Sequence, residues 1–281
     1  MSLLQVIVLS VVQGITEFLP VSSSGHLALI PWIAGWPDQG TAFDVALHLG
    51  TMSAVLIYFR SEWAGFLVGL LKGRGVAFGG GGDGEISARR LLLLVVIGTA
   101  PAAVIGLLTK GFIESTAREP QWIGVFLIGT ATALAIGELA GKRKRGLSET
   151  SKLDAVIIGL GQAAAILPGL SRSGTTIATG MAIGMTREAA ARFSFLLVVP
   201  VILGAAVLVL GDAVLGNGAP PQGFANPPWG VMVLGGAIAF ATALVALWGL
   251  MKMLRRYPLW IFAAYAFLLG SGIIIARTLG A

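Results

Sequence analysis

The fold is decided by the stretch Gln13-Gly-Ile-Thr-Glu17-Phe-Leu-Pro-Val-Ser-Ser-Ser-Gly-His26, which is polar and rich in serine. It lies in the middle of an apolar region that runs from residue 3 to residue 34. The proline and the glycine interrupt a helix, and broken backbone at membrane depth is tolerated only where protein covers it or where it lines a wet cavity. We therefore expect residues 3–34 to form a re-entrant helix–loop–helix hairpin.

A second stretch of the same kind, Pro168-Gly-Leu-Ser-Arg-Ser-Gly-Thr-Thr176, interrupts the apolar region 153–185. It predicts a second re-entrant hairpin. A shift of 149 residues superimposes the two regions without a gap, and it aligns four polar or glycine positions: Gln13 with Gln162, Ser22 with Ser171, Ser24 with Ser173, and Gly25 with Gly174. The two halves of the chain therefore resemble repeats of each other.

The composition surrounding these stretches is that of a membrane protein. Of the 281 residues, 56% are hydrophobic and 11% are charged, whereas a soluble protein carries about 25% charged residues. A mean hydropathy of +0.88 agrees with this. A spanning helix needs about 20 apolar residues, and six segments of that kind are found: 43–60, 91–109, 121–140, 193–212, 230–251 and 258–276. The absence of cysteine excludes disulfides and cysteine-based metal sites or nucleophiles.

These segments predict an all-α polytopic membrane protein with six transmembrane helices and two re-entrant hairpins. Residues 1–281 are expected to form one integral membrane domain, with repeat 1 at about 1–141 and repeat 2 at about 150–281. Each repeat is a hairpin followed by three helices. Because three is odd, the second repeat enters from the opposite face, and an inverted-topology repeat of this kind places a site near the midplane.

The positive residues predict the orientation, because cytoplasmic loops carry an excess of Lys and Arg. One face holds three such residues, Lys110, Arg118 and Arg277, and the loop 213–229 on that face contains none. The other face, expected to be cytoplasmic, holds fifteen: Arg60, Lys72, Arg74, Arg89, Arg90, Lys142, Arg143, Lys144, Arg145, Lys152, Arg187, Arg192, Lys252, Arg255 and Arg256. Both termini are then outside, and the first hairpin enters from the outer face. The glycine-rich segment 73–90 is expected to be a flexible linker.

The first hairpin carries a carboxylate in apolar surroundings. Gln13 and Glu17 are four residues apart and share a helix face. An ionisable residue inside a membrane is a functional candidate, although a helix-packing hydrogen bond is the alternative. Ser22, Ser23 and Ser24 can cap the helix that we expect to begin near His26, and one or two of them could do only that. His26 can act as a general acid, a general base or a nucleophile.

The second hairpin supplies a cation and more hydroxyl groups. Arg172 suits bidentate recognition of phosphate, and a salt bridge to Glu17 in the empty state is the alternative. A helix start at Gly174 would add amide donors. The hydroxyls that could contact the same anion are Ser171, Ser173, Thr175 and Thr176. His48, the second histidine of the chain, lies inside a predicted span and is expected to be a packing residue, with a position near the cavity as the alternative. Together the two loops favour a phosphoryl group over a neutral solute.

At both stretches the sequence resembles the undecaprenyl-diphosphate phosphatase family, also called the bacitracin-resistance family. The resemblance implies hydrolysis of a C55 isoprenyl diphosphate to the monophosphate, which recycles the carrier lipid for peptidoglycan synthesis. It implies that the catalytic residues are Glu17, Ser23, His26 and Arg172. It also implies a divalent metal, Mg²⁺ or Ca²⁺, bound by Glu17 with Gln13. The other residues of the two loops, Ser22, Ser24, Ser171, Ser173, Thr175 and Thr176, are then expected to bind substrate together with Gln13.

Three mechanisms stay open at this point. Ser23 attacks phosphorus after activation by His26, His26 activates a water molecule, or His26 attacks directly. The rival function is a lipid-phosphate flippase or secondary transporter, because inverted repeats with broken helices also build transporters. The expected location is the bacterial inner membrane, with the site open to the periplasmic face. The expected partners are the isoprenyl diphosphate substrate and membrane lipids, with a homodimer left open and no nucleic acid.

Overall fold

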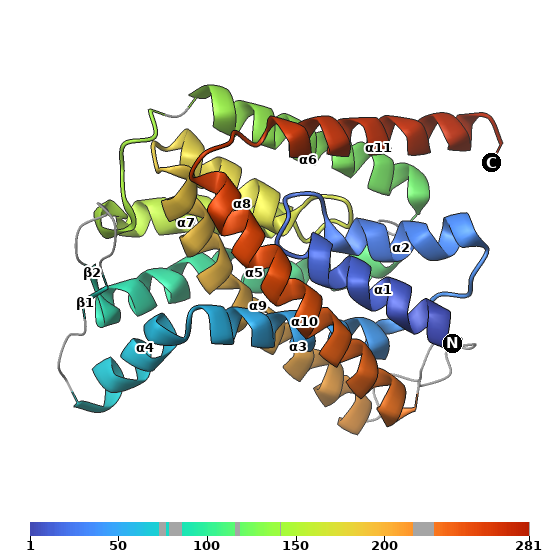
Figure 1. Cartoon of the computed structure of the whole chain (residues 1–281), viewed down its shortest axis with the longest axis horizontal. Helices are drawn as coiled ribbons and strands as arrows, with labels where there is room; N and C mark the ends of the chain where they lie inside the picture. The colour runs from blue at the N-terminus through green and yellow to red at the C-terminus, as the bar shows by residue number, and fades with distance from the viewer. Residues whose placement is uncertain (73–76, 79–85, 116–118, 141, 216–227, 281) are drawn as a thin grey trace.

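The computed structural model describes residues 1–72, 77–78, 86–115, 119–140, 142–215 and 228–280. Within these ranges the protein is built mainly from α-helices, and six of them are long and apolar enough to cross a membrane (Figure 1). The six are α3 (Thr41–Tyr58), α5 (Ala88–Ser115), α6 (Pro120–Ala140), α9 (Arg187–Leu215), α10 (Trp229–Leu254) and α11 (Trp260–Thr278). The six predicted spans are thereby confirmed, although α9 begins at Arg187 instead of residue 193.

Both predicted hairpins are present as helix–loop–helix units. The first consists of α1 (Leu3–Thr16) and α2 (Ser23–Ala34), and the second of α7 (Lys152–Ala164) and α8 (Arg172–Ala182). Figure 1 shows the first hairpin entering from the end of the molecule that holds both termini, and the second from the opposite end. Their loops meet near the centre. This arrangement fits two re-entrant hairpins that reach the middle of a membrane from opposite sides.

The two hairpins are built with the same helix caps. The Ser22 Oγ accepts the Gly25 N–H at 3.3 Å, and the Ser171 Oγ accepts the Gly174 N–H at 3.0 Å. An N-cap hydroxyl satisfies one of the free amides of the first turn, which explains why each helix begins immediately after its cap. The helices therefore begin at Ser23 and Arg172, earlier than the starts expected near His26 and at Gly174.

The first helices of the two hairpins, α1 and α7, also begin in the same way. Ser2 caps α1 and Ser151 caps α7, each in a reciprocal capping box with the residue three positions on. Ser2 and Ser151 are separated by the same 149 positions that align the two serine-rich loops. The recurrence of local structure supports the repeat, while its boundaries at about 1–141 and 150–281 stay predictions.

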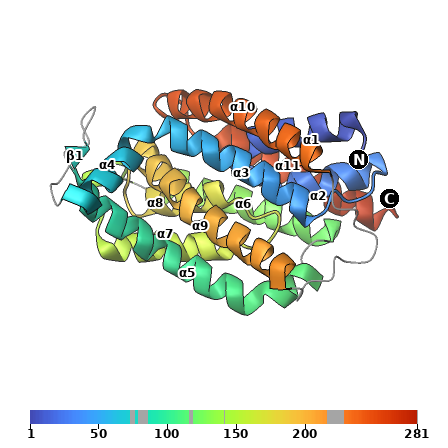
Figure 2. The ribbon, with the colours of Figure 1, turned by 90° about the horizontal axis from the view of Figure 1, so that it is seen from below.

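Equivalent helices of the two repeats make equivalent packing contacts. The first helix of one hairpin, α1, packs along α10, and the matching helix of the other hairpin, α7, packs along α5. Figure 2 shows α10 lying beside α3. The last spans of the two halves, α6 and α11, pack together at Gly124 and Gly270. A Cβ added at Gly270 would lie 2.6 Å from the Gly124 carbonyl oxygen, so this close crossing requires glycine.

Aromatic packing fixes the tip of the first hairpin. Phe18 is fully buried, and its ring meets the edge of the Phe195 ring with centroids 5.5 Å apart. Phe59 lies against the same Phe195 ring. Edge-on aromatic pairs add roughly 0.5–1.5 kcal/mol to the burial itself. The residue before Phe18 in the chain is Glu17, so this cluster positions the carboxylate.

Some short elements were not predicted from the sequence. Helix α4 (Arg60–Lys72) follows α3, and a one-turn 3₁₀ helix, η1, covers Leu147–Glu149. In the segment expected to be a flexible linker, strand β1 (Ala77–Phe78) pairs antiparallel with β2 (Ile86–Ser87). That expectation is therefore wrong for these four residues and for residues 88–90, where α5 begins. The glycine run 79–82 and most of the loop 213–229 lie outside the described residues.

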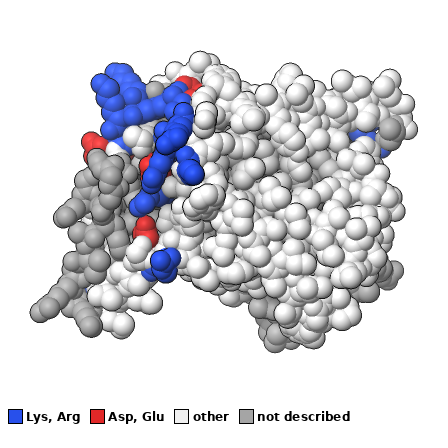
Figure 3. Space-filling view, in the orientation of Figure 1, with Lys and Arg blue, Asp and Glu red and all other residues white. Residues whose placement is uncertain are grey.

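Lysine and arginine gather at one end of the molecule, the end opposite the two termini (Figures 1 and 3). This is the distribution expected of a polytopic protein with one basic face. Of the cations counted in the sequence, Arg74 and Arg118 lie outside the described residues, as do the side chains of Lys72 and Lys110.

Candidate functional site

Glu17 is the centre of the contacts between the two hairpins. It directly follows α1, where the helix ends before Pro20, and only 5% of its surface is exposed. The Gln13 Nε2 donates to its Oε2 at 2.9 Å, as expected for residues four apart on a helix. The Ser23 hydroxyl donates to the same oxygen at 2.6 Å. A buried carboxylate is thus held by two neutral donors from its own hairpin.

Arg172 brings the opposite charge from the second hairpin. It is the first residue of α8, and its guanidinium forms an ion pair with the Glu17 Oε1. The side chain of Arg172 is 18% exposed and that of Glu17 is 1% exposed, so the pair is largely shielded from solvent. The salt bridge to Glu17 that the sequence offered as an alternative is therefore present in the structure.

The two loops are joined by hydrogen bonds around this pair. The Gly169 N–H donates to the Ser22 Oγ at 3.2 Å, and the Ser173 Oγ donates to the Leu19 carbonyl at 3.2 Å. Gly169 has a φ of +102°, and a Cβ there would lie 2.6 Å from the Ile123 carbonyl oxygen. Glycine is therefore required at this position for the second tip to fit against α6 and the first tip.

Thr130 of α6 secures the second tip from the other side. Its hydroxyl donates to the Gly169 carbonyl at 2.9 Å and accepts the Ser171 N–H at 2.8 Å. The residue is fully buried. Because one hydroxyl satisfies both a free carbonyl and a free amide of the loop, it keeps the broken backbone hydrogen-bonded inside the protein. Thr130 was not identified from the sequence.

His26 makes different contacts from those of Glu17. Its Nδ1 lies 2.7 Å from the Ser22 carbonyl oxygen, and its Nε2 lies 2.7 Å from the Tyr265 hydroxyl. The residue is 8% exposed. Among the contacts of the described residues, none joins the His26 ring to Glu17, Ser23 or Arg172. The sequence places His26 three residues after Ser23 on α2, so both lie on neighbouring positions of one helix face.

His48 lies at the site, although it was expected to be a packing residue. Its Nε2 is 3.6 Å from the Glu17 Oε2, and its Nδ1 is 2.7 Å from the Asp44 carbonyl oxygen. The alternative considered from the sequence, a position near the cavity, is therefore what the structure shows. The signal that could have found it is the rule applied to Glu17, that an ionisable side chain in a span is a functional candidate.

The remaining hydroxyls bond within the protein. Ser24 is exposed, with its Oγ 3.4 Å from that of Ser22, and the Ser171 and Ser173 Oγ atoms are 3.1 Å apart. Thr175 donates to the Ser171 carbonyl at 2.9 Å, and Thr176 lies 2.6 Å from the Ser194 Oγ. Ser22 acts as a cap, as considered from the sequence, and Ser171 is the corresponding cap of the second hairpin. Substrate binding by these hydroxyls stays a prediction.

The predicted metal ligands fit a hard cation in part. The Gln13 Oε1 is buried and has no hydrogen-bond partner among the described residues, while the amide nitrogen of the same side chain contacts Glu17. An amide oxygen and a carboxylate are ligands that Mg²⁺ accepts, with waters and substrate phosphate completing its shell. No group of three or more His, Asp or Glu side chains suited to a metal is found in the described part of the chain. A metal here would therefore depend on substrate oxygens.

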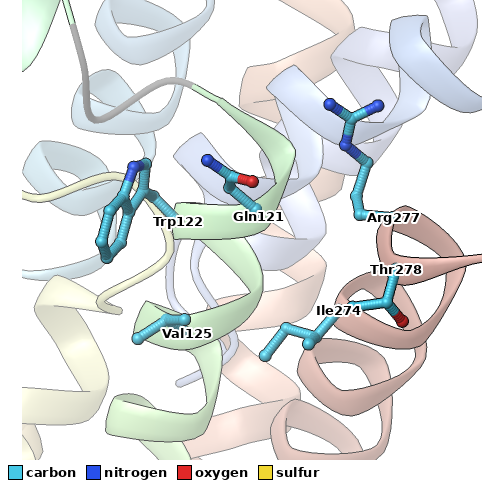
Figure 4. A pocket seen from close by; sticks show the side chains of 6 residues that line it. All are labelled: Gln121, Trp122, Val125, Ile274, Arg277 and Thr278. Atoms are coloured by element: carbon cyan, nitrogen blue, oxygen red, sulfur yellow. The ribbon is translucent and has the colours of Figure 1, made fainter. Parts of the chain in front are cut away.

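A separate cleft of about 350 Å³ lies between α6 and α11. Figure 4 shows its lining: Gln121, Trp122 and Val125 on α6, and Ile274, Arg277 and Thr278 on α11. It contains none of the residues that surround Glu17. The candidate site is therefore the buried junction of the two hairpins.

Six membrane-length helices around two broken hairpins, with a shielded Arg–Glu pair at their junction, define a polytopic membrane protein with a charged pair buried between the hairpins. The chain belongs to the bacitracin resistance protein BacA family, whose model matches residues 6–272. It is 41% identical over 276 residues to an undecaprenyl-diphosphatase of Geobacter metallireducens, covering 98% of both chains. It is 40% identical over 279 residues to undecaprenyl-diphosphatase 1 of Pseudoalteromonas translucida, covering 99% of this chain and all of the relative.

Proposed function

We propose that this chain hydrolyses undecaprenyl diphosphate to undecaprenyl phosphate and inorganic phosphate. The observation that carries the proposal is the Arg172–Glu17 ion pair, which brings a guanidinium and a carboxylate from two hairpins into one shielded junction. Relatives that match the chain over nearly its whole length carry the name undecaprenyl-diphosphatase. The protein is a hydrolase of the membrane, and its role fits recycling of the carrier lipid for cell-wall synthesis and resistance to bacitracin. The transporter alternative is not favoured.

Arg172 provides anion recognition. Its charge is balanced by Glu17 in the structure. An arriving diphosphate carries more negative charge and offers paired oxygens, which a planar guanidinium binds in a bidentate manner. The first-turn amides of α2 and α8 add donors on either side, since both helices begin at the junction. Arg172 would then stabilise the charge that spreads over the transferred phosphoryl group.

The Ser23 hydroxyl proton points to Glu17, which supports serine as the nucleophile and Glu17 as the proton acceptor. In this mechanism the Ser23 Oγ bonds to the terminal phosphorus and its proton moves to the Glu17 Oε2. The bond from phosphorus to the bridging oxygen breaks, and undecaprenyl phosphate leaves. Water then hydrolyses the phosphoserine and releases phosphate. The alternatives are direct attack by His26 and attack by a water molecule that His26 activates. Neither alternative forms a phosphoserine adduct, so the absence of this adduct after one turnover would exclude the serine mechanism.

Glu17 and Gln13 would hold a divalent cation, because one presents a carboxylate and the other an amide oxygen without a partner among the described residues. When bound, Mg²⁺ or Ca²⁺ would neutralise part of the diphosphate charge. We expect a chelator to lower phosphate release by purified protein by at least tenfold, and added Mg²⁺ or Ca²⁺ to restore it. Full activity after exhaustive chelation would contradict a metal at this site.

Replacement of Arg172 by lysine tests anion recognition. Lysine keeps the charge but loses the fork of donors, so we expect phosphate release to fall by about 10²-fold. The matched control is Arg255→Lys, at an ion pair with Glu188 on the exposed basic end. The measurement is the rate of phosphate release from undecaprenyl diphosphate by purified protein. Equal rates for both variants would argue against a phosphate contact at Arg172.

The proposed location is the bacterial inner membrane, with the basic end in the cytoplasm and the termini outside. The clustering of Lys and Arg at the end opposite the termini supports this orientation. The first hairpin, which carries Glu17 and Ser23, would then enter from the periplasmic side, and the diphosphate would be hydrolysed there.

A further inference from the structure

Tyr265 lies on α11, and its hydroxyl reaches His26 of the first hairpin. It is one of three tyrosines in the chain, and it is 45% exposed on the surface of a membrane-length helix. Its hydroxyl lies 2.7 Å from the His26 Nε2. The ring of Tyr265 could pack on the helix surface without its hydroxyl. The hydrogen bond between this hydroxyl and a buried histidine therefore indicates a specific role for that contact.

The contacts of His26 determine which nitrogen carries the proton. The Nδ1 lies 2.7 Å from the Ser22 carbonyl oxygen, which can only accept, so Nδ1 is the donor. In the neutral ring the Nε2 then has a lone pair, and the Tyr265 hydroxyl donates to it. The two bonds together select one tautomer. Partner contacts of this kind are what set the chemical role of a histidine nitrogen.

The orientation of the ring is fixed as well. The His26 and Tyr265 rings are stacked with centroids 5.8 Å apart and an interplanar angle of 8°. The Ser22 carbonyl also accepts the backbone N–H of His26 at 3.2 Å. His26 therefore closes the first turn of α2 with both its ring and its backbone, and this is the turn that begins with Ser23.

We propose that Tyr265 is a positioning residue for the hydrolytic reaction, which acts by holding the His26 ring in its Nδ1–H tautomer against the first turn of α2. This proposal rests on the proposed function, because its effect is measured in the turnover of undecaprenyl diphosphate. Through His26, Tyr265 fixes the turn that presents Ser23 and directs the basic Nε2 toward α11. Loss of the hydroxyl would release the ring while leaving Arg172 and the phosphate contacts in place. The effect therefore falls on kcat rather than on KM.

The substitution Tyr265→Phe tests the proposal by kinetics. Loss of one neutral hydrogen bond is expected to lower kcat about fivefold, with KM changed less than twofold. Tyr257→Phe is the matched control, because Tyr257 is 61% exposed in the turn before α11. Unchanged kcat in Tyr265→Phe, or a loss confined to KM, would overturn the positioning role.

A second experiment, ¹⁵N NMR of the histidine ring, detects the hydrogen bond in the absence of substrate. The chain has two histidines, so His48→Gln leaves His26 as the single imidazole for ¹⁵N NMR. We expect a protonated Nδ1 and a hydrogen-bonded, unprotonated Nε2, and a shift of the Nε2 signal toward the free-acceptor position when Tyr265→Phe is added. A protonated Nε2, or a signal that Tyr265→Phe does not move, would overturn the proposal. Because this arm needs no turnover, it distinguishes loss of the Tyr265 contact from failure of the proposed function.

Discussion

Replacing Glu17 by glutamine is expected to lower phosphate release from undecaprenyl diphosphate by about 10³-fold. The carboxylate accepts the Ser23 hydroxyl at 2.6 Å and pairs with Arg172. Glutamine keeps the shape but cannot take the Ser23 proton, and a positioned base contributes about 10²–10⁴-fold. The substitution also replaces a charged carboxylate of the proposed metal site by a neutral amide oxygen. A loss of 10³-fold corresponds to about 4 kcal/mol in the transition state.

The control for this variant is another glutamate on the same chain. Glu188→Gln removes a carboxylate at the exposed basic end, where it pairs with Arg255, and should keep the rate of the unchanged protein. Both proteins are compared by phosphate release and by thermal unfolding, so that a loss of folded protein is not mistaken for a loss of chemistry. A folded Glu17→Gln variant with a rate within tenfold of the original would argue against the role of Glu17.

Replacing Glu138 by glutamine is expected to destabilise the protein by about 3–5 kcal/mol, the usual effect of removing one partner of a buried ion pair. Glu138 lies near the end of α6 and is 5% exposed. It accepts two bonds from Arg187 of α9, at 2.8 and 2.6 Å, and one from the Leu259 N–H just before α11, at 2.7 Å. Arg143 pairs with the same carboxylate at 2.9 Å. One side chain therefore joins three spans.

Because unfolding of membrane proteins is often irreversible, this effect is best measured as the inactivation half-life at a fixed temperature. Glu188→Gln again provides the comparison, since its ion pair with a 62% exposed arginine is worth about 0–1 kcal/mol. Glu138→Gln should shorten the half-life at least a hundredfold relative to that control. Similar half-lives for the two variants would show that the Glu138 cluster is not a major source of stability.

The parts of the fold that could be predicted from sequence are those with a local cause. Apolar length determines the six spans, and the serine–glycine loops interrupt two shorter apolar regions where helices cannot continue. The 149-residue shift then indicated that the two loops are equivalent. This was enough to expect Arg172 and Glu17 to meet, because both lie at hairpin tips directed to the midplane.

The parts that could not be predicted depend on how distant helices are rotated against each other. Tyr265 contacts His26 across 239 residues of sequence, and hydropathy does not specify which face of α11 turns toward α2. The contact of His48 with Glu17 has the same origin, since it requires the register between α3 and the first tip. Thr130 could not be distinguished in sequence from Thr132, the other threonine of α6, whose hydroxyl donates to the Ile128 carbonyl of its own helix.

The most direct test of the account is a double-mutant cycle of Glu17→Gln and Arg172→Lys, read as phosphate release from undecaprenyl diphosphate. Residues that act as one unit show strongly non-additive losses. If the two hairpin tips form one site, the double variant should be within about tenfold of Glu17→Gln alone. Losses that multiply to about 10⁵-fold would show that the two residues act independently, and would contradict a single site at the hairpin junction.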